Sequence, residues 1–347
     1  MAWLDRLRQI EAFDGIEFDP ALLAAFEAAP TTRRIRFHTP SFKTYRGCEL
    51  GGCGKNSFPA FSVTAGACAL QCDHCRAGVL APMIAATSPE MLEEKVEALV
   101  LSDGLRGFLL SGGSNRRNEI AYERFWPAVR RIKARHPYLR VAAHTALLDD
   151  GRARAMEAAG VDVAMMDVIG SADTIRDVYH LDRPVSDFEA SLAALRRTRM
   201  RVVPHIVIGL HHGRIRGEAA ALEIVARQRV DALVLVIVMP QFAAIGTPFS
   251  LVPPASAAEV FRAARVRLGD TPLLLGCARP SGLHKRAVDA YAVMAGVDGI
   301  AFPAEGAVAL ARALRRPFEQ HHACCSIAID AGGVEAGLTA DLPMVPA

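Results

Sequence analysis

The sequence predicts an α/β fold in which eight parallel strands and their helices close into a (β/α)8 barrel of the TIM type. Two observations carry this prediction. Short apolar runs alternate with helical patterns along most of the chain, and polar and sulfur-bearing residues gather directly after those runs. Alternation of this kind indicates parallel βα units, and eight such units close as a barrel. A doubly wound open sheet is the runner-up.

Eight segments have the apolar, β-prone character of buried strands. Most are followed by a helical pattern, and the first such helix is expected after Ser88, an N-cap with Pro89 behind it, and to stop at Gly104. Another helix is expected to open at Ser256, within the Ser-x-x-Glu of a capping box. The predicted strands are residues 58–64, 107–111, 139–144, 161–167, 200–209, 232–240, 272–276 and 299–303.

An extension and a tail flank the predicted barrel. Residues 1–57 are expected to form an N-terminal extension, residues 58–316 the barrel, and residues 317–347 a C-terminal tail. The extension starts with two short amphipathic helices, followed by a basic segment, residues 33–38, that is expected to be irregular.

Composition and charge narrow the class of protein. A chain of 347 residues with 51% hydrophobic and 22% charged residues is long enough for one large domain. The formal charge of +3 does not indicate a nucleic-acid surface, and the longest apolar run, residues 232–239, is too short to span a membrane. The first residues mix acids and bases, so we expect no signal peptide and a cytoplasmic protein.

Three cysteines lie close together directly after the first predicted strand. Cys68, Cys72 and Cys75 are separated by three and then two residues. Three thiolates hold three irons of a cubane cluster and leave the fourth iron open to another ligand. Zinc sites usually pair one C-x2-C with a second, which is absent here, and the polar loop residues Gln71 and Asp73 argue against buried apolar thiols.

This spacing resembles the cluster loop of the radical S-adenosylmethionine (SAM) enzymes. In that family the three cysteines bind a [4Fe-4S] cluster, and SAM chelates the free iron. The residue before the last cysteine is usually aromatic there, and here it is His74. The resemblance implies that Cys68, Cys72 and Cys75 bind such a cluster, and that the cofactors are this cluster and SAM.

Further residues after the strands are candidates for binding SAM. The Ser111-Gly-Gly-Ser114 segment resembles the family motif that binds the SAM amino group through backbone carbonyls, although the family often ends it with Glu. Asp167 is suited to accept from ribose hydroxyls or the SAM ammonium, and residues 206–209 resemble the segment that packs on adenine. The expected cofactor-binding residues are Ser111, Gly112, Gly113, His144, Asp167, His205, Gly209 and Met239.

The other five cysteines suggest a second iron–sulfur cluster. They lie in the extension, at the end of the seventh strand and in the tail, from where they can converge over the barrel mouth. Thiolates prefer iron–sulfur clusters or zinc, and unrelated thiols are the alternative. Ser281, Ser326 or Arg279 is a candidate for a weaker fourth ligand. The candidate cysteine ligands are Cys48, Cys53, Cys277, Cys324 and Cys325.

The cysteine positions of this chain differ from those of two related branches of the family, the biotin synthases and the ordinary lipoyl synthases. Biotin synthase places its second-cluster cysteines after strands two, three and five, where this chain has Ser111, His144 and His205. Ordinary lipoyl synthases carry C-x4-C-x5-C ahead of the barrel. This chain keeps the C-x4-C, but the third position is Pro59.

The closest resemblance is to the split lipoyl synthases, in which Cys-x-Arg-Pro and a late Cys-Cys recur. Here they are matched by Cys277-Ala-Arg-Pro280 and Cys324-Cys325. The resemblance implies a sulfurtransferase that inserts sulfur into an octanoyl chain on a lipoyl-carrier protein, with a second radical SAM subunit and an electron donor as further partners. The auxiliary cluster would be the sulfur source.

The role of the basic segment and the function of the protein each have alternative interpretations. The basic residues 33–38, with Lys43 and Arg46, could meet an acidic carrier domain or form a solvated face. The protein could instead be a mutase or ring-forming enzyme of the biotin synthase-like group, whose extra cysteines are structural. From another class, it could be a zinc-stabilised barrel or assembly subunit without catalysis.

Overall fold

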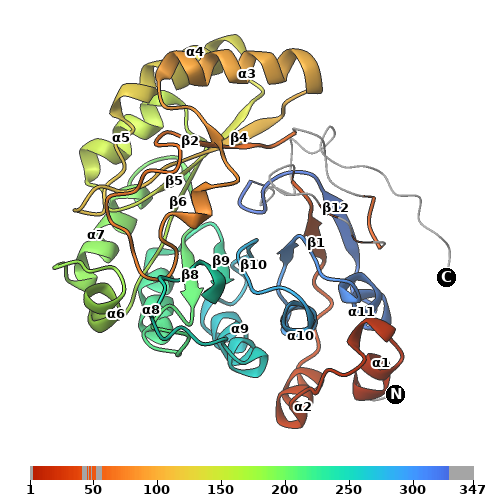
Figure 1. Ribbon diagram of the computed structural model, residues 1–347. Coiled ribbons are helices and arrows are strands. Elements are labelled where there is room, and N and C mark those ends of the chain that lie inside the picture. Colours follow the sequence, from red (N-terminus) through yellow and green to blue (C-terminus); the bar gives the residue numbers. More distant parts are fainter. Residues whose placement is uncertain (1–2, 41–44, 46, 48, 52–56, 328–347) are drawn as a thin grey trace.

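Two parallel sheets form the framework of the computed structural model, which describes residues 3–40, 45, 47, 49–51 and 57–327 (Figure 1). In this part of the chain each sheet has six strands, in the orders β12-β1-β11-β10-β9-β8 and β3-β2-β4-β5-β6-β7. Cys48, Cys53, Lys43 and Arg46 lie outside the described residues, so the predictions for them remain predictions.

The two sheets meet in one bent strand. β7 (Arg201–Val202) ends one sheet, and β8 (His205–Ile208) begins the other with only two residues between them. Around the bend, the Val203 N–H donates to the Ala164 oxygen at 2.9 Å and the Val168 N–H donates to the His205 oxygen at 2.8 Å. Counting β7 and β8 as one strand, all eight predicted strands are present, and the prediction of a (β/α)8 fold is confirmed. The remaining seven are β2 (Ala60–Ser62), β4 (Gly107–Ser111), β5 (Arg140–Thr145), β6 (Val163–Met166), β9 (Leu233–Ile237), β10 (Leu273–Leu275) and β11 (Gly299–Ala301).

Three further strands extend the sheets. β3 (Ile84–Ala85) pairs with β2, β1 (Ile35–His38) pairs with β11, and β12 (Phe318–His321) pairs with β1, all in parallel. The prediction that residues 33–38 are irregular is therefore wrong. Ile35 and Phe37 are fully buried, and the intervening Arg36 is neutralised by Glu319 of β12, with its Nε 2.7 Å from the carboxylate.

Helices cover the outside of the barrel (Figure 1). α3 (Pro89–Asp103) begins as predicted, because the Ser88 hydroxyl accepts the Met91 N–H at 3.2 Å. α9 (Pro254–Leu268) begins two residues before Ser256 and has no side-chain cap, so the predicted capping box is wrong. The other α-helices described are α1 (Trp3–Arg8), α2 (Pro20–Ala28), α4 (Trp126–Arg135), α5 (Asp150–Ala159), α6 (Ala172–Asp177), α7 (Val185–Arg196), α8 (Glu218–Gln228), α10 (Leu283–Met294) and α11 (Ala307–Ala313).

The hydrophobic core has two parts. The larger lies between strands and helices, and the smaller gathers inward-facing strand residues such as Val163 and Val234. Ala323 and Cys325, which follow β12, belong to this smaller cluster and are buried there. The tail thus packs against the inner face of the sheets. No helix among the described residues combines the length and hydrophobicity that a membrane span needs.

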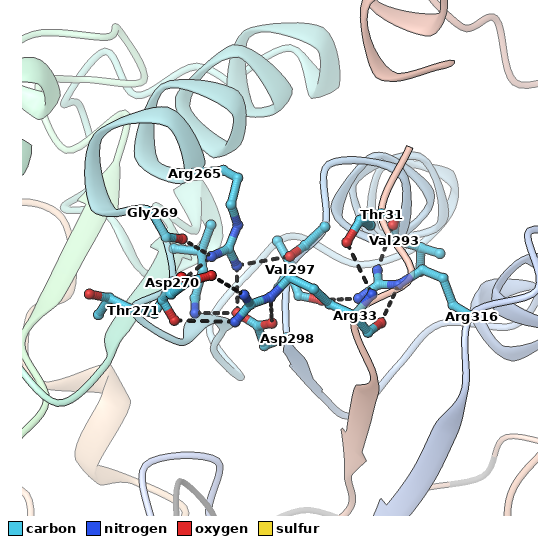
Figure 2. Close-up of polar contacts among 12 residues, drawn as sticks. Thr31, Arg33, Arg265, Gly269, Asp270, Thr271, Val293, Val297, Asp298 and Arg316 are labelled. Carbon is cyan, nitrogen blue, oxygen red and sulfur yellow. Dashed lines mark hydrogen bonds and ion pairs between the residues drawn. The ribbon is translucent and has the colours of Figure 1, made fainter. Parts of the chain in front are cut away.

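A cluster of arginines holds the first strand in place, at the end of the strands where they begin (Figure 2). Asp298, just before β11, accepts from Arg33 at 2.6 Å, from Arg265, and from the Leu273 N–H at 2.8 Å. The buried guanidinium of Arg316 donates to three backbone oxygens, including that of Arg33 at 3.0 Å. Because Asp298 joins the approach to β1 with β10 and β11, the extension is tied to the barrel.

Replacing this carboxylate should weaken the fold. Asp298→Asn keeps the shape but leaves Arg265 without its charge partner and Arg33 with only the exposed Asp270, and we expect a loss of about 2 kcal/mol in the free energy of unfolding. Urea-unfolding midpoints measure the effect. Asp270→Asn is the matched control, because Asp270 also pairs with Arg33 but is fully exposed, so its midpoint should stay at the wild-type value. Equal shifts in both variants would contradict this account.

Candidate active site at the barrel mouth

A cavity of about 290 Å³ lies among the carboxyl ends of the strands. Its walls are mainly apolar, with contributions from β2 through β11 and from the residues after β12. Active sites of barrels of this type lie at the same end of the strands. The polar and sulfur-bearing side chains that line it are His74, Cys75, Met83, Ser111, His144, Met165, Asp167, His205, Met239, Cys277, Cys324, Cys325 and Ser326.

The three-cysteine loop follows β2 and packs tightly against the loop after β4. The Ala69 N–H donates to the Ser114 oxygen at 2.8 Å, and the Cys68 thiol lies 3.7 Å from the same oxygen. A Cβ on Gly113 would come within 2.6 Å of the Cα and Cβ of Cys68 and within 2.0 Å of the Ala67 oxygen. Only glycine therefore allows the two predicted motifs to lie against each other.

The loop turns back on itself around its last cysteine. The N–H groups of Cys75 and Arg76 both point to the Cys72 oxygen, at 3.2 and 3.0 Å, and the Gly78 N–H donates to the Cys75 oxygen at 2.6 Å. Cys75 faces the cavity, whereas Cys68 and Cys72 are not among its lining residues. His74 also lines the cavity, and its ring stacks on Tyr179 with centroids 5.1 Å apart.

The donor set fits an iron–sulfur cluster better than a single metal ion. Burial, together with the neighbouring thiols, raises the pKa of Cys72 far above its usual value, and burial raises that of Cys75 to about 11. Both thiols must therefore lose a proton when they bind a metal. Among the described residues, no group of three or more His, Cys, Asp or Glu is placed to hold a metal ion. A cubane cluster does not need its ligands to meet at one metal ion, because each thiolate binds a different iron.

Two histidines and a carboxylate form the polar part of the cavity. Nε2 of His144 lies 3.6 Å from Oδ1 of Asp167, and the rings of His144 and His205 have centroids 5.2 Å apart. Burial acts to raise the pKa of Asp167, but the interactions with His144 and His205 outweigh it and lower the pKa. Burial and repulsion by His144 lower the pKa of His205 to about 3, so its ring is neutral. The group can accept from hydroxyl or ammonium groups of a ligand.

The other predicted SAM-binding residues fall into two groups. Ser111 and Met239 line the cavity, whereas Gly112, Gly113 and Gly209 do not. Gly209 has a backbone role: its φ is +75°, and a Cβ there would lie 2.1 Å from the Val252 side chain. Its N–H donates at 2.8 Å to Glu218, a buried carboxylate that the sequence analysis missed.

Three of the five remote cysteines converge on the same cavity. Cys277 follows β10, Cys324 and Cys325 follow β12, and all three line the cavity that Cys75 also lines. A hydrogen bond from the Cys325 thiol lowers the pKa of Cys324, and the same contact raises that of Cys325. Ser326 lines the cavity beside them. Thiols from two distant parts of the chain thus face one space.

Arg279 does not reach this space, and its prediction as a fourth ligand is wrong. Its side chain is fully buried and forms a bidentate pair with Asp289 of α10, with nitrogen–oxygen distances of 2.7 and 2.8 Å. It also donates to the backbone oxygens of Gly276 at 2.6 Å and Phe302 at 3.1 Å. The pair fixes the backbone on both sides of Cys277. Ser281 is exposed and does not line the cavity.

Residues 33–38 are not a free basic surface. Arg33 pairs with Asp270 and Asp298, and Arg34 and Arg36 both pair with Glu319. These residues lead into and form β1, away from the cavity lining. The predicted contact of this segment with an acidic carrier domain is therefore not favoured.

Comparison with known proteins gives likeness at the level of the fold. No protein-family model matches the chain, and no curated protein matches it significantly. The fold is similar to HydG, a maturase of the [FeFe]-hydrogenase, with 14% identity, 86% of this chain and 68% of that chain covered, and a TM-score of 0.56. Methylornithine synthase (PylB) is 12% identical, with 91% of this chain and 97% of that chain covered and a TM-score of 0.54. HydG from Carboxydothermus hydrogenoformans is 14% identical, with 87% of this chain and 67% of that chain covered and a TM-score of 0.50. The chain thus shares the α/β barrel fold of these proteins.

Proposed function

We propose that this protein is a radical SAM enzyme that binds a [4Fe-4S] cluster through Cys68, Cys72 and Cys75. The observation that carries the proposal is that Cys75 lines the same cavity as His144, Asp167 and His205. The thiol loop, which would leave one iron of a bound cluster open, and the polar groups that would bind a ligand therefore adjoin one space at the barrel mouth.

The chain's own residues have positioning roles in this proposal. Cys68, Cys72 and Cys75 would hold the cluster, which when bound and reduced would supply the electron for radical chemistry with SAM at an unactivated carbon. Asp167 accepts from the ribose hydroxyls or the ammonium of SAM, and neutral His205 leaves that carboxylate as the charged group. The apolar walls, among them Val236 and Phe302, exclude water from the reacting groups.

The finer proposal is sulfur insertion into an octanoyl chain carried on a lipoyl-carrier protein, as a component of a lipoyl synthase. It is favoured by the three thiols of Cys277, Cys324 and Cys325, which line the cavity together. An auxiliary iron–sulfur cluster bound there would supply the sulfur, with Cys48, Cys53 and Ser326 as candidates for further ligands. The mainly apolar cavity suits an aliphatic chain.

The reaction needs partners beyond SAM. An electron donor must reduce the cluster, and we propose a second radical SAM subunit as a partner. If the extra cysteines hold no cluster, the same barrel would serve a mutase or ring-forming reaction in place of sulfur insertion.

Removing a thiol of the cluster loop should abolish SAM cleavage. Cys72→Ser takes away one of three cluster ligands, so we expect the loss of one cluster per chain and at least a hundredfold drop in 5′-deoxyadenosine formation. Anaerobic reconstitution followed by iron analysis and chromatography measures both. Cys277→Ser is the matched control and should still cleave SAM. A Cys72→Ser protein that cleaves SAM at the wild-type rate would refute the ligand assignment.

The second cluster is tested by removing the cavity thiols together. In a variant with Cys277, Cys324 and Cys325 all changed to Ser, we expect iron to fall from about eight to about four atoms per chain. The sulfur-bearing product from an octanoyl-lysyl peptide should disappear, while SAM cleavage persists. Product mass is read with reductant and SAM, with and without candidate partner subunits. A wild-type protein with only about four irons would exclude sulfur insertion from an auxiliary cluster.

A further inference from the structure

Exposed apolar side chains gather around the mouth of the cavity. Of the eight large hydrophobic side chains that are exposed in the described residues, five follow strands at their carboxyl ends. Loops in this position share one face of a barrel. Ile245 is fully exposed, and the others are 40–57% exposed. We call these five residues the apolar strip: Val79, Ile215, Ile245, Leu251 and Leu283.

Contacts between the loops make the apolar strip continuous. The Ala244 N–H donates to the Asp73 oxygen at 2.7 Å, and a Cβ on Gly78 would lie 2.9 Å from the Phe242 ring. The loop that carries Ile245 therefore lies against the loop that carries Val79.

The same loop continues toward the other members. The Ser250 N–H donates to the His212 oxygen at 3.3 Å, which brings Leu251 next to the loop of Ile215. Nε2 of His284 lies 2.7 Å from the Val252 oxygen, which joins Leu251 to the start of α10, where Leu283 is. A partner can thus contact all five residues on one face.

The apolar strip begins at the cavity itself. Val79 and Phe242 line the cavity, so its wall passes directly into the exposed surface. A volume of about 290 Å³ admits a small molecule or an extended chain but not a folded domain. A protein substrate bound to the strip would therefore have to send a thin apolar arm inward past Val79.

Unpaired cations flank the apolar strip. Arg76 and Arg214 are exposed, next to the loops of Val79 and Ile215, and no ion pair of either with another described residue is present. Arg216, two residues further on, pairs with Asp173, and the nearby Asp73 is occupied by His180 at 3.0 Å. Free positive charge beside apolar surface favours a negatively charged protein partner.

We infer that the apolar strip, with Arg76 and Arg214, is the docking surface for a small acidic protein domain that carries an aliphatic acyl group on a flexible lysyl arm. The inference rests on the proposed function, because the acyl group is the octanoyl chain of that reaction. The domain covers the strip, acidic side chains pair with the two arginines, and the arm enters the cavity past Val79.

Binding of a labelled, octanoylated lipoyl-carrier domain to the reconstituted full-length protein tests this surface. Ile245→Glu places a charge on the apolar strip and Arg214→Glu reverses a flanking charge, and each should weaken binding at least tenfold in fluorescence anisotropy. The matched controls are Val266→Glu, at the far end of α9, and Arg154→Glu, on α5; both side chains are exposed, and both variants should bind like wild type. Equal binding by all four variants would overturn the inference.

Two further measurements distinguish a failure of the docking surface from a failure of the proposed function. The ratio of turnover on the carrier domain to turnover on a short octanoyl-lysyl peptide should fall about tenfold in Ile245→Glu. A wild-type protein that converts neither substrate would refute the proposed function, while the binding comparison still judges the docking surface. Loss of self-association in Ile245→Glu, measured by sedimentation with carrier binding unchanged, would assign the strip to a second copy of the chain and overturn the inference.

Discussion

Parallel strand pairing is the constraint on which the rest of this structure depends. Every pairing between the strands β1 to β12 of the described residues is parallel, so each strand ends at the same rim and each following loop lies on the same face. Cys75 and Cys325 are separated by most of the chain, yet they line one cavity because both follow strands of this kind. Without this common direction, the motifs would be scattered over the surface.

The sequence predicted the barrel well because its strands lie in short apolar runs with helical patterns between them. It did not predict β1 and β12. In β1, buried Ile35 and Phe37 alternate with Arg36 and His38, and the polar members find their partners, Glu319 and His321, only on β12. A pairing between two ends of a chain leaves no local signal, so a short, half-charged strand is read as a loop.

The same limit applies to the candidate site. Position after a predicted strand was enough to place Cys75 and Cys277 at the barrel mouth, and Cys324 and Cys325 were expected to reach it from the tail; all four line the cavity. Arg279 is turned away from the cavity by its ion pair with Asp289, a residue within α10 that belongs to no recognisable sequence motif. Likewise, the role of Glu218 follows only from its contact with the Gly209 N–H, which the sequence does not reveal. Ligand types can be predicted from sequence, but the buried partners that hold a loop in position cannot.

The position of the tail in the fold also determines when the barrel can complete its folding during synthesis. β1 leaves the ribosome long before its two neighbours, β11 and β12. Until then β1 is an unpaired edge, and the inner core lacks Ala323 and Cys325. Non-local pairings of this kind form late in folding. The barrel therefore reaches its final packing only after β11 and β12 have been synthesised, and its thiol-lined cavity is complete only then.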